Sequence, residues 1–423
     1  MHALIAECRK GIPPQVEEIA KDEQISPEKM AKAIAEGRIT LPANPRRPHR
    51  VCAIGQGCRV KVNVNVGTSA SRCNETLEVE KGMAAVENGA DTLMDLSTGG
   101  DLVSMRKKIL ALDVPVGTVP IYEAVRRAGN AADVDADLLF RVVREHCEQG
   151  VDFLTLHCGV NREALSALRE DPRILSVVSR GGAFHVAMMV YRGEENPLYS
   201  EFDYLLEILK EYDVVASLGD GMRPGSVCDA ERLAKSVEYV ALGRLARRSL
   251  DAGVQRFIEG PGHIPLEQIG YNVRILKEVT DGAPLYLLGP LVTDIAAAYD
   301  HVVAAIGGAV ACMHGADFLC MVSPSEHLAL PSTDDIIEGT RVTKIAAHVG
   351  DTLRREESRR QERAMADARR ALDWEEQFRL ALFGDPARVI HERDGAMDTC
   401  SMCGDLCAVR MVRELFEKEE PNR

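Results

Sequence analysis

The sequence predicts an α/β protein: a (β/α)8 TIM-like barrel with a helical N-terminal appendage and a C-terminal helical arm. Between residues 60 and 330, short apolar runs alternate with stretches long enough for helices, which is the pattern of parallel strands joined by crossover helices. Glycines and polar residues follow these runs, as expected at the strand ends that carry a barrel's active site. The 423 residues therefore divide into an appendage (1–50), a barrel (51–345) and an arm (346–423).

The appendage is predicted from helix start and stop signals. Ser26 suits a helix cap, Pro27 the first helical position and Gly37 the C-terminal stop, so 14–37 should form helices joined by a turn. Residues 41–49 contain three prolines and cannot hold regular structure. We expect residues 1–50 to wrap the barrel domain.

Nine apolar runs compete for the eight strand positions of a barrel, so at least one of them should lie outside it. They are residues 60–66, 92–96, 116–119, 153–157, 174–178, 214–218, 255–259, 285–288 and 317–321. The arm begins with a charged, helix-prone stretch at 351–383, typical of a solvated helix face. The apolar stripe with Trp374 and Phe378 should dock this arm.

Composition excludes several classes of partner. The formal net charge of −14 argues against nucleic acid, which needs a basic face. No run of about 18 apolar residues is present, and residues 1–20 lack the apolar core of a signal peptide, so no membrane partner and a cytoplasmic location are expected. Nine of the twelve cysteines are scattered without paired spacing, which favours free thiols in a reducing compartment.

The other three cysteines, Cys400, Cys403 and Cys407, lie within eight residues and can converge on one metal centre. A structural zinc site could be completed by His391 or another histidine. A 4Fe–4S cluster held by three cysteines would keep one iron open, which suits S-adenosylmethionine. The spacing alone does not choose between zinc and iron.

Polar groups at predicted strand ends suggest binding functions. The turn Ser179-Arg-Gly-Gly182 lets backbone amides approach an anion, although glycines after strands are often simple turns. Asp220 and Arg223, on a constrained loop, can together bind hydroxyl and phosphate groups. His263 and His327 end strands on the same face and could share a divalent metal, although single histidines are commonly structural.

Six motifs and their order resemble the ThiC superfamily of radical S-adenosylmethionine enzymes, over roughly residues 10–410. The motifs are Met94-Asp-Leu-Ser-Thr-Gly-Gly100, Val116-Gly-Thr-Val-Pro-Ile-Tyr122, Ser179-Arg-Gly-Gly182, Glu259-Gly-Pro-Gly-His263, Leu288-Gly-Pro-Leu-Val-Thr-Asp294 and Cys400-Ser-Met-Cys403-Gly-Asp-Leu-Cys407.

The resemblance implies a substrate, 5-aminoimidazole ribonucleotide, and a set of ligands. His263 and His327 would hold a mononuclear divalent metal (zinc or iron), and the cysteines Cys400, Cys403 and Cys407 would hold a 4Fe–4S cluster that binds S-adenosylmethionine. The residues that match the family's substrate positions are Asn65, Met94, Tyr122, His157, Ser179, Arg180, Gly181, Gly182, Asp220, Arg223, Glu259 and Tyr286.

The resemblance also implies a reaction, of carbon–carbon lyase type. A radical formed from S-adenosylmethionine at the reduced cluster would take hydrogen from the ribose, and imidazole and sugar carbons would recombine into a new ring. Glu259 would help to fix sugar and base, and Cys312 or Cys320 could relay hydrogen, with a core position as the alternative for either thiol. An electron donor such as flavodoxin or ferredoxin, and a homodimer, are the expected partners.

Two products are known in the superfamily: hydroxymethylpyrimidine phosphate for thiamine and 5-hydroxybenzimidazole for the lower ligand of cobamides. The chain departs from the thiamine pattern beside the site, with Ala296-Ala-Ala-Tyr-Asp-His301 in place of Ala-Pro-Gly-Tyr-Asp-His and with changes at 255–259, 327–331 and after Asp229. From these departures we expect the benzimidazole product, with the thiamine precursor as the alternative. A third hypothesis is a non-catalytic nucleotide-binding barrel with a zinc clamp.

Overall fold

The computed structural model describes residues 4–393, 395 and 398–419. The chain divides into two compact units, Met1–Gly350 and Asp351–Arg423. The first unit contains a closed barrel of eight parallel strands in the order β10-β3-β4-β5-β6-β7-β8-β9. The predicted fold class is therefore confirmed.

The barrel is filled by side chains from alternate strands. The strands are β3 (Lys61–Val66), β4 (Thr92–Asp95), β5 (Val116–Thr118), β6 (Phe153–Leu156), β7 (Val215–Leu218), β8 (Arg256–Gly260), β9 (Leu285–Leu288) and β10 (Phe318–Cys320). The Phe257 ring lies 5.4 Å from that of Phe153 and 5.5 Å from that of Phe318, centre to centre. Tyr286 stacks on Phe318 at 4.2 Å. These rings form an apolar floor, and polar groups are left to the layer above it.

Eight of the nine predicted runs form barrel strands, and the run at 174–178 does not. Ile174 is 74% exposed, and the backbone N–H groups of Ile174 and Leu175 each donate to the Asp229 carboxylate at 2.9 Å. A side chain therefore satisfies the backbone donors that a strand would give to its neighbour. The strand prediction at 174–178 is wrong.

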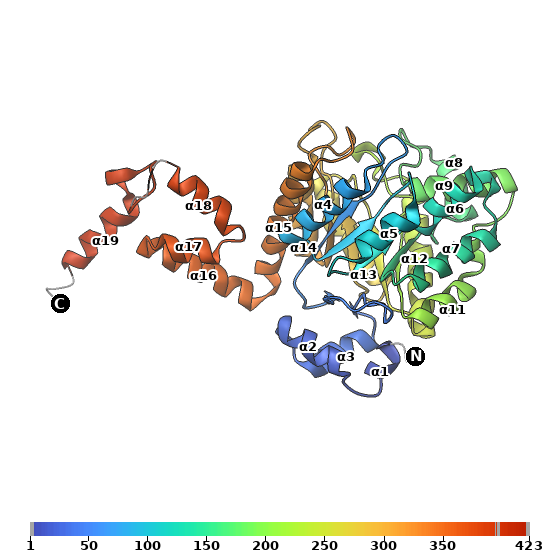
Figure 1. Cartoon of the computed structure of the whole chain (residues 1–423), viewed down its shortest axis with the longest axis horizontal. Helices are drawn as coiled ribbons and strands as arrows, with labels where there is room; N and C mark the ends of the chain where they lie inside the picture. Colours follow the sequence, from blue (N-terminus) through green and yellow to red (C-terminus); the bar gives the residue numbers. More distant parts are fainter. Residues whose placement is uncertain (1–3, 394, 396–397, 420–423) are drawn as a thin grey trace. The chain divides into compact units, whose positions relative to one another are not determined.

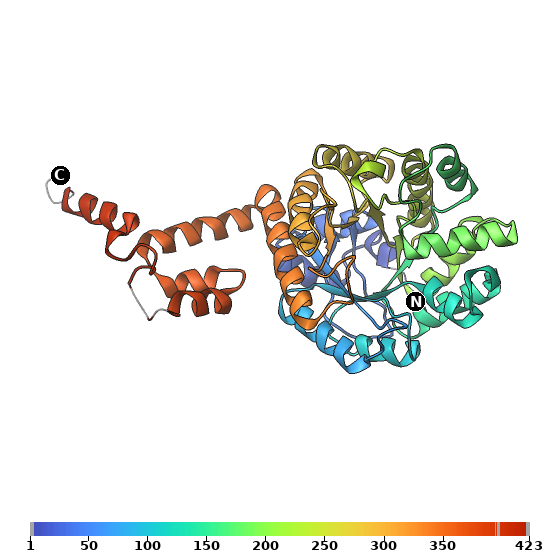
Figure 2. The ribbon, with the colours of Figure 1, turned by 90° about the horizontal axis from the view of Figure 1, so that it is seen from above.

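Helices surround the barrel, as the view from above shows (Figure 2). They are α4 (Glu75–Glu87), α5 (Leu102–Leu110), α6 (Pro120–Ala128), α7 (Ala136–Glu148), α8 (Arg162–Glu170), α9 (Arg180–Arg192), α10 (Pro197–Ser200), α11 (Phe202–Tyr212), α12 (Leu233–Ala252), α13 (Leu266–Val279), α14 (Asp300–His314) and α15 (Thr333–Arg354), with short 3-10 turns η1 (Ala131–Asp133) and η2 (Val227–Asp229).

The N-terminal segment forms α1 (Leu4–Cys8), α2 (Pro14–Asp22), α3 (Pro27–Ala35) and a two-stranded sheet of β1 (Ile39–Thr40) and β2 (Ile54–Gly55). As predicted, the Ser26 side chain accepts the Lys29 N–H, Pro27 opens the helix, and Gly37 follows it at a φ of +70°. The three helices lie together at one end of the barrel (Figure 1). Elements as short as α1 and β1 leave too little periodicity to be predicted.

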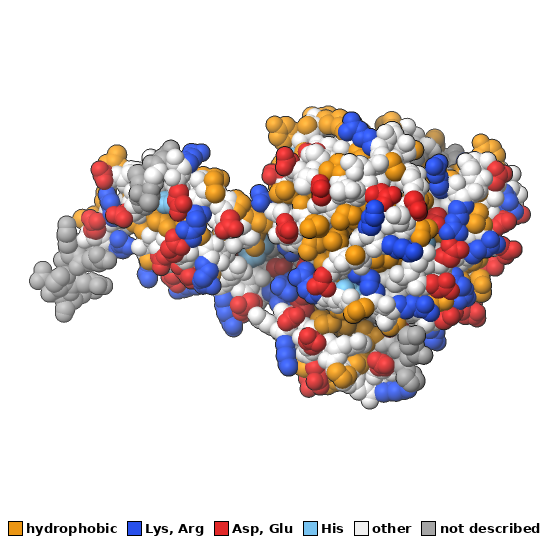
Figure 3. Space-filling view, in the orientation of Figure 1, with side chains coloured by type: hydrophobic (Ala, Val, Ile, Leu, Met, Phe, Trp, Pro, Cys, Tyr) orange, Lys and Arg blue, Asp and Glu red, His pale blue; other side chains and the backbone are white. Residues whose placement is uncertain are grey.

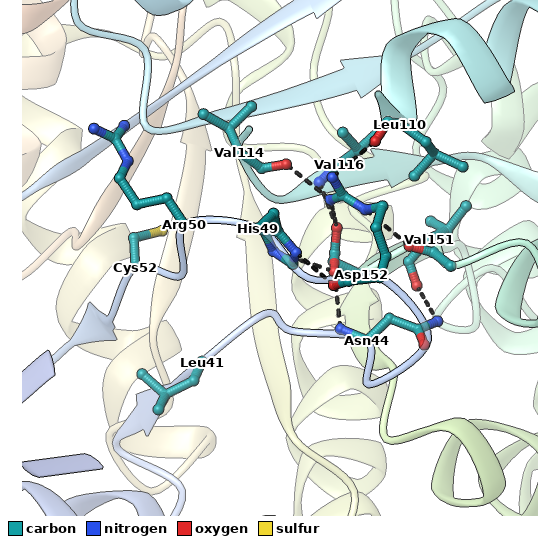
Figure 4. A network of polar contacts seen from close by, with 12 residues as sticks. Leu41, Asn44, His49, Arg50, Cys52, Leu110, Val114, Val116, Val151 and Asp152 are labelled. Carbon is teal, nitrogen blue, oxygen red and sulfur yellow. Dashed lines mark hydrogen bonds and ion pairs between the residues drawn. The ribbon is translucent and has the colours of Figure 1, made fainter. Parts of the chain in front are cut away.

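Asp152, one residue before β6, fastens the N-terminal segment to the barrel. Its buried carboxylate accepts the backbone N–H groups of Asn44 and Val116, both at 2.8 Å, and pairs with the Arg47 guanidinium. Figure 4 shows Asn44 and His49 pointing toward Asp152. Arg47 also donates to four backbone carbonyls, of Leu110, Leu112, Val114 and Gly150.

The Asp152→Ala variant should therefore lose about 3–5 kcal/mol of unfolding free energy, because Arg47 would keep its buried charge and lose its partner. Urea unfolding of the full chain measures this loss. The control is Asp203→Ala, which removes the exposed partner of Arg248 and should cost about 1 kcal/mol or less. Equal losses in the two variants would contradict this account of the network.

The surface of the first unit carries both signs of charge. Acidic and basic side chains are intermixed over the face that Figure 3 shows. Among the described residues, none of the helices combines the length and apolar character that a membrane crossing needs.

The second unit contains α16 (Glu356–Ala371), α17 (Trp374–Leu380), α18 (Gly384–Glu392), the 3-10 turn η3 (Gly404–Leu406) and α19 (Ala408–Glu419). The predicted apolar stripe packs within this unit, because Trp374 stacks on His391 of α18 at 3.9 Å and Phe378 lies 5.7 Å from the same ring. His391, the histidine considered for a zinc site, thus has an aromatic contact of its own.

Candidate functional site

A cavity of about 90 Å³ opens at the C-terminal end of the barrel strands, above the aromatic floor. It is lined by Asn65, Met94, Leu96, Val119, Tyr122, Thr155, His157, Ser179, Asp220, Arg223, Glu259, Gly260, Tyr286, Leu288 and Cys320. All the predicted substrate-binding residues except Arg180, Gly181 and Gly182 are in this lining. Residues from most of the strands and from the loops after them are thus collected around one space.

The two glycines have a steric role beside the cavity. A Cβ at Gly181 would lie 2.2 Å from the His157 ring, and one at Gly182 would lie 2.4 Å from the Gly221 carbonyl. Only glycine lets the first turn of α9 approach so closely. Arg180, next to them, places its guanidinium 5.2 Å from the centre of the Tyr122 ring and lines a neighbouring cavity.

Glu259 and Asp220 bring two carboxyl groups into the cavity. Glu259 Oε1 accepts the hydroxyls of Thr155 at 2.8 Å and Ser217 at 2.5 Å, so one of its oxygens is fixed by neighbouring strands. Asp220 Oδ1 accepts Arg223 Nη1 at 2.9 Å. Burial raises the pKa of Asp220 well above its usual value; Arg223 opposes this shift, and the Glu259 charge adds to it. Asp220 is therefore suited to carry a proton.

The Asp220–Arg223 loop is held from behind by two buried residues that sequence reasoning missed. Glu238 on α12 accepts the Met222 N–H at 2.9 Å, and Arg173 donates to the Met222 carbonyl at 2.7 Å. Thr155 and Ser217 were missed as well, although they are partners in the register of β6 and β7. A search for polar residues inside the predicted strands would have found this pair.

The surroundings of His157 in this site favour the neutral form of its imidazole. It is buried, and its Nε2 is 3.1 Å from the Ser179 hydroxyl, which also accepts the Gly182 N–H. Burial, then the nearby His185 and Arg223, lowers the pKa of His157 well below its usual value. His185, 6.1 Å away between ring centres, was not predicted, because nothing in the sequence distinguishes it from other core residues of α9.

Cys320 lies in the cavity and Cys312 does not line it. Asn65 donates to Cys320 Sγ at 3.2 Å, and Asn63 donates to the Tyr286 hydroxyl at 2.8 Å. Burial raises the pKa of Cys320 to about 11, so it remains a thiol at neutral pH. Cys312 is buried on α14, beside Gly350. Of the two thiols predicted to relay hydrogen, only Cys320 lines the cavity with the predicted substrate-binding residues.

Iodoacetamide should label Cys320 slowly, because at pH 8 it holds about 100-fold less thiolate than a cysteine of ordinary pKa. Its labelling rate should rise about tenfold per pH unit between pH 8 and 10, since the thiolate fraction does so below the pKa. Mass spectrometry of timed samples gives both rates, with the exposed Cys228 as the internal control. Labelling of Cys320 that keeps pace with Cys228 would contradict the assignment.

The two predicted metal-binding histidines meet beside the cavity. The rings of His263, after β8, and His327, after β10, are 5.1 Å apart between centres. Each Nδ1 faces a carboxylate, Asp294 at 2.8 Å and Asp300 at 3.8 Å. His327 has a φ of +61°, a strained conformation for a histidine that places its ring beside His263.

An imidazole hydrogen-bonded to a carboxylate, as His263 is to Asp294, is suited to a divalent metal. The structure offers a metal at this place only these two histidine ligands among the described residues. Within 4–393, 395 and 398–419, no group of three or more His, Cys, Asp or Glu side chains is arranged to hold a metal ion. The histidine pair would leave the remaining metal positions to water or substrate.

A second cavity, of about 550 Å³, adjoins the first at Asn65 and Leu96. It reaches His327 and its neighbour Glu326, and it carries charges of both signs. The ion pair of Lys81 and Glu78 is buried in its wall, with the Lys81 nitrogen 2.6 Å from the carboxylate. Because the two cavities share lining residues, together they form a space within the size range of small-molecule binding sites.

The three clustered cysteines occupy a tight turn of the second unit. The Cys403 and Gly404 N–H groups donate to the Cys400 carbonyl at 3.2 and 3.0 Å, and the Cys407 N–H donates to the Gly404 carbonyl at 3.3 Å. Backbone N–H groups, first that of Cys403, lower the pKa of the Cys400 thiol. A thiolate is the form that ligates iron or zinc, so three cysteines suit either metal by residue type, but within the described residues their side chains are not arranged around a common ion.

Comparison with known proteins covers nearly the whole chain. The model of the Radical SAM ThiC family matches residues 3–414. Relatives named phosphomethylpyrimidine synthase include one from Methanosarcina mazei, 54% identical over 99% of both chains, and one from Archaeoglobus fulgidus, 51% identical over 98% of this chain and 100% of the other. A dihydropteroate synthase structure from Thermus thermophilus matches with a TM-score of 0.40 and 18% identity over 70% of this chain and 94% of that one, too distant to add to the argument.

The family model matches almost all residues, and relatives of the same length are about half identical to the chain. The chain therefore belongs to the radical SAM ThiC family.

Proposed function

We propose that the chain is a phosphomethylpyrimidine synthase that converts 5-aminoimidazole ribonucleotide into hydroxymethylpyrimidine phosphate for thiamine. The observation that carries the proposal is the 51–54% identity, over nearly full length, to relatives of that name. These relatives favour the alternative product over the expected 5-hydroxybenzimidazole, which they do not support. The departures near Ala296 and after Asp229 were a weaker guide than identity along the whole chain.

The cavity offers groups that match the parts of this substrate. The N-terminal end of α9, whose capping residue Ser179 lines the cavity, is proposed to face the phosphate. The carboxyls of Asp220 and Glu259, with Arg223, suit the sugar hydroxyls and the amino-imidazole. The rest of the cavity wall is formed by Asn65, Met94, Tyr122 and Tyr286. The aromatic rings beneath the cavity exclude water from that side.

The cofactors implied by the family are a 4Fe–4S cluster and S-adenosylmethionine. Together they supply a carbon-centred radical that can take hydrogen from an unreactive C–H bond. Cys400, Cys403 and Cys407 are proposed as the cluster ligands, and the adjoining cavity as the place for S-adenosylmethionine. His263 and His327 are proposed to hold a mononuclear zinc or iron ion.

The protein's own residues position the substrate and manage protons. Asp220 can donate a proton to the substrate, and Glu259, fixed by Thr155 and Ser217, can accept one. Cys320 is proposed to give a hydrogen atom to a substrate radical; the sulfur radical left behind would regain one electron from the electron donor and one proton from solvent. That donor, the homodimer and the carbon–carbon lyase classification stay predictions.

Product analysis tests the proposal. The reduced, cluster-loaded enzyme is incubated anaerobically with 5-aminoimidazole ribonucleotide and S-adenosylmethionine, and the products are separated by mass. Hydroxymethylpyrimidine phosphate is the expected product, absent when S-adenosylmethionine is omitted. 5-Hydroxybenzimidazole would overturn the proposed function, and the absence of any new product would favour the non-catalytic barrel.

A further inference from the structure

Asp294, in the loop after β9, connects the histidine pair with the substrate loop. Its Oδ1 lies 2.8 Å from His263 Nδ1, and its Oδ2 accepts the Val227 N–H at 2.9 Å. Val227 begins η2, four residues after Arg223. Both oxygens of one carboxylate are thus engaged by groups that border the site.

The backbone fixes the distance between His263 and Asp294. A short parallel bridge joins His263 to Leu291: the Ile264 N–H donates to the Leu291 carbonyl at 3.0 Å, and the Leu291 N–H donates to the Gly262 carbonyl at 2.8 Å. The imidazole and the carboxylate therefore project from two segments that are already bonded to each other. A freely rotating surface pair would not be constrained in this way.

A carboxylate only accepts hydrogen bonds, which decides the tautomer of His263. The neutral ring must carry its proton on Nδ1, facing Asp294, and this leaves the Nε2 lone pair for a metal. His327 has a weaker arrangement, since its Nδ1 is 3.8 Å from Asp300, beyond hydrogen-bond distance. Asp294 is the stronger of the two determinants.

We propose that Asp294 is a positioning residue that fixes the tautomer and orientation of His263 for a divalent metal at the histidine pair. The inference rests on the metal site proposed above. It assigns a role to a residue outside the lining of both cavities. It predicts that metal affinity depends on whether the side chain at position 294 accepts a hydrogen bond from His263 or donates one to it.

The Asp294→Asn variant separates this role from simple support of the fold. The Val227 N–H needs an oxygen acceptor, so the asparagine would keep its oxygen there and turn its amide NH2 group toward His263 Nδ1. The ring would then have to accept at Nδ1 and carry its proton on Nε2, where the metal should bind. A nearly isosteric change that keeps the loop contact should therefore still weaken metal binding.

The test uses the full-length, cluster-loaded protein, stripped of other metal and titrated anaerobically with Zn²⁺ against a competing chelator. Loading the cluster first keeps the three cysteines from binding zinc. Wild type should bind one zinc ion more than His263→Ala. Both Asp294→Ala and Asp294→Asn should weaken that binding about 10- to 100-fold, with unchanged unfolding midpoint for Asp294→Asn.

The control is Asp101→Asn, which alters the helix-capping carboxylate of α5 and should leave zinc affinity unchanged. Wild-type affinity in Asp294→Asn would overturn the inference. If wild type binds no more zinc than His263→Ala, the metal site itself fails and the inference with it. The proposed function is tested separately, by the identity of the reaction product.

Discussion

Replacing Cys403 by serine should abolish iron incorporation and all cleavage of S-adenosylmethionine. A 4Fe–4S cluster bound by three thiolates cannot keep its open iron site when one thiolate is lost, so iron should fall from about four per chain to near zero. The same result is expected for Cys400→Ser and Cys407→Ser. Iron analysis, visible absorption and the yield of 5′-deoxyadenosine measure these losses.

The control for this series is Cys228→Ser, an exposed cysteine outside the cluster motif, which should keep wild-type iron and activity. The zinc-clamp hypothesis predicts a different pattern. It predicts a colourless wild-type protein with one zinc ion per chain and no cleavage of S-adenosylmethionine. Such a result would remove the radical chemistry from the account.

Replacing Glu259 by glutamine should lower kcat/KM about 10²- to 10³-fold. The amide oxygen can still accept the Thr155 and Ser217 hydroxyls, but the amide has no charge and donates to the cavity where the carboxylate accepted. Steady-state kinetics with 5-aminoimidazole ribonucleotide measure the effect. As a control, Thr155→Val removes one hydroxyl donor and keeps the carboxylate, so its loss should be smaller. Equal kcat/KM in Glu259→Gln and wild type would exclude Glu259 from the reaction.

The Glu259→Gln variant should also shift the pH dependence of the activity. The Glu259 charge contributes to the raised pKa of Asp220, so its removal should lower that pKa, although burial still keeps it above its usual value. If Asp220 acts as a proton donor, activity is present below its pKa and is lost as the pH rises through it. The alkaline limb of the profile should therefore lie at lower pH in Glu259→Gln than in wild type. A limb at unchanged pH would mean that Asp220 is not the titrating group.

The sequence was sufficient for the barrel because eight strand-helix units repeat one pattern, and strand ends gather on one rim. The family resemblance implied Asn65, His157, Glu259 and Tyr286 as substrate-binding residues, and all four line the cavity at that rim. The run at 174–178 misled because apolar residues also occur in exposed loops. The spacing of apolar residues does not reveal that the backbone N–H of Ile174 donates a hydrogen bond to the distant Asp229 and not to a neighbouring strand.

The contacts that support the site were beyond sequence reasoning. Asp294 reaches His263 across 31 residues, and Glu238 holds the Asp220 loop from a helix, so both depend on how loops return over the barrel mouth. The substitutions beside the site led to the expectation of 5-hydroxybenzimidazole, whereas relatives at 51–54% identity carry the name phosphomethylpyrimidine synthase.

The central claim is that this chain rebuilds its ribonucleotide substrate into a pyrimidine. The most direct measurement uses 5-aminoimidazole ribonucleotide labelled with carbon-13 in the ribose, supplied to the reduced holoenzyme with S-adenosylmethionine. The account predicts hydroxymethylpyrimidine phosphate with ribose-derived label in its pyrimidine skeleton. A labelled benzimidazole, or a pyrimidine without label, would contradict it.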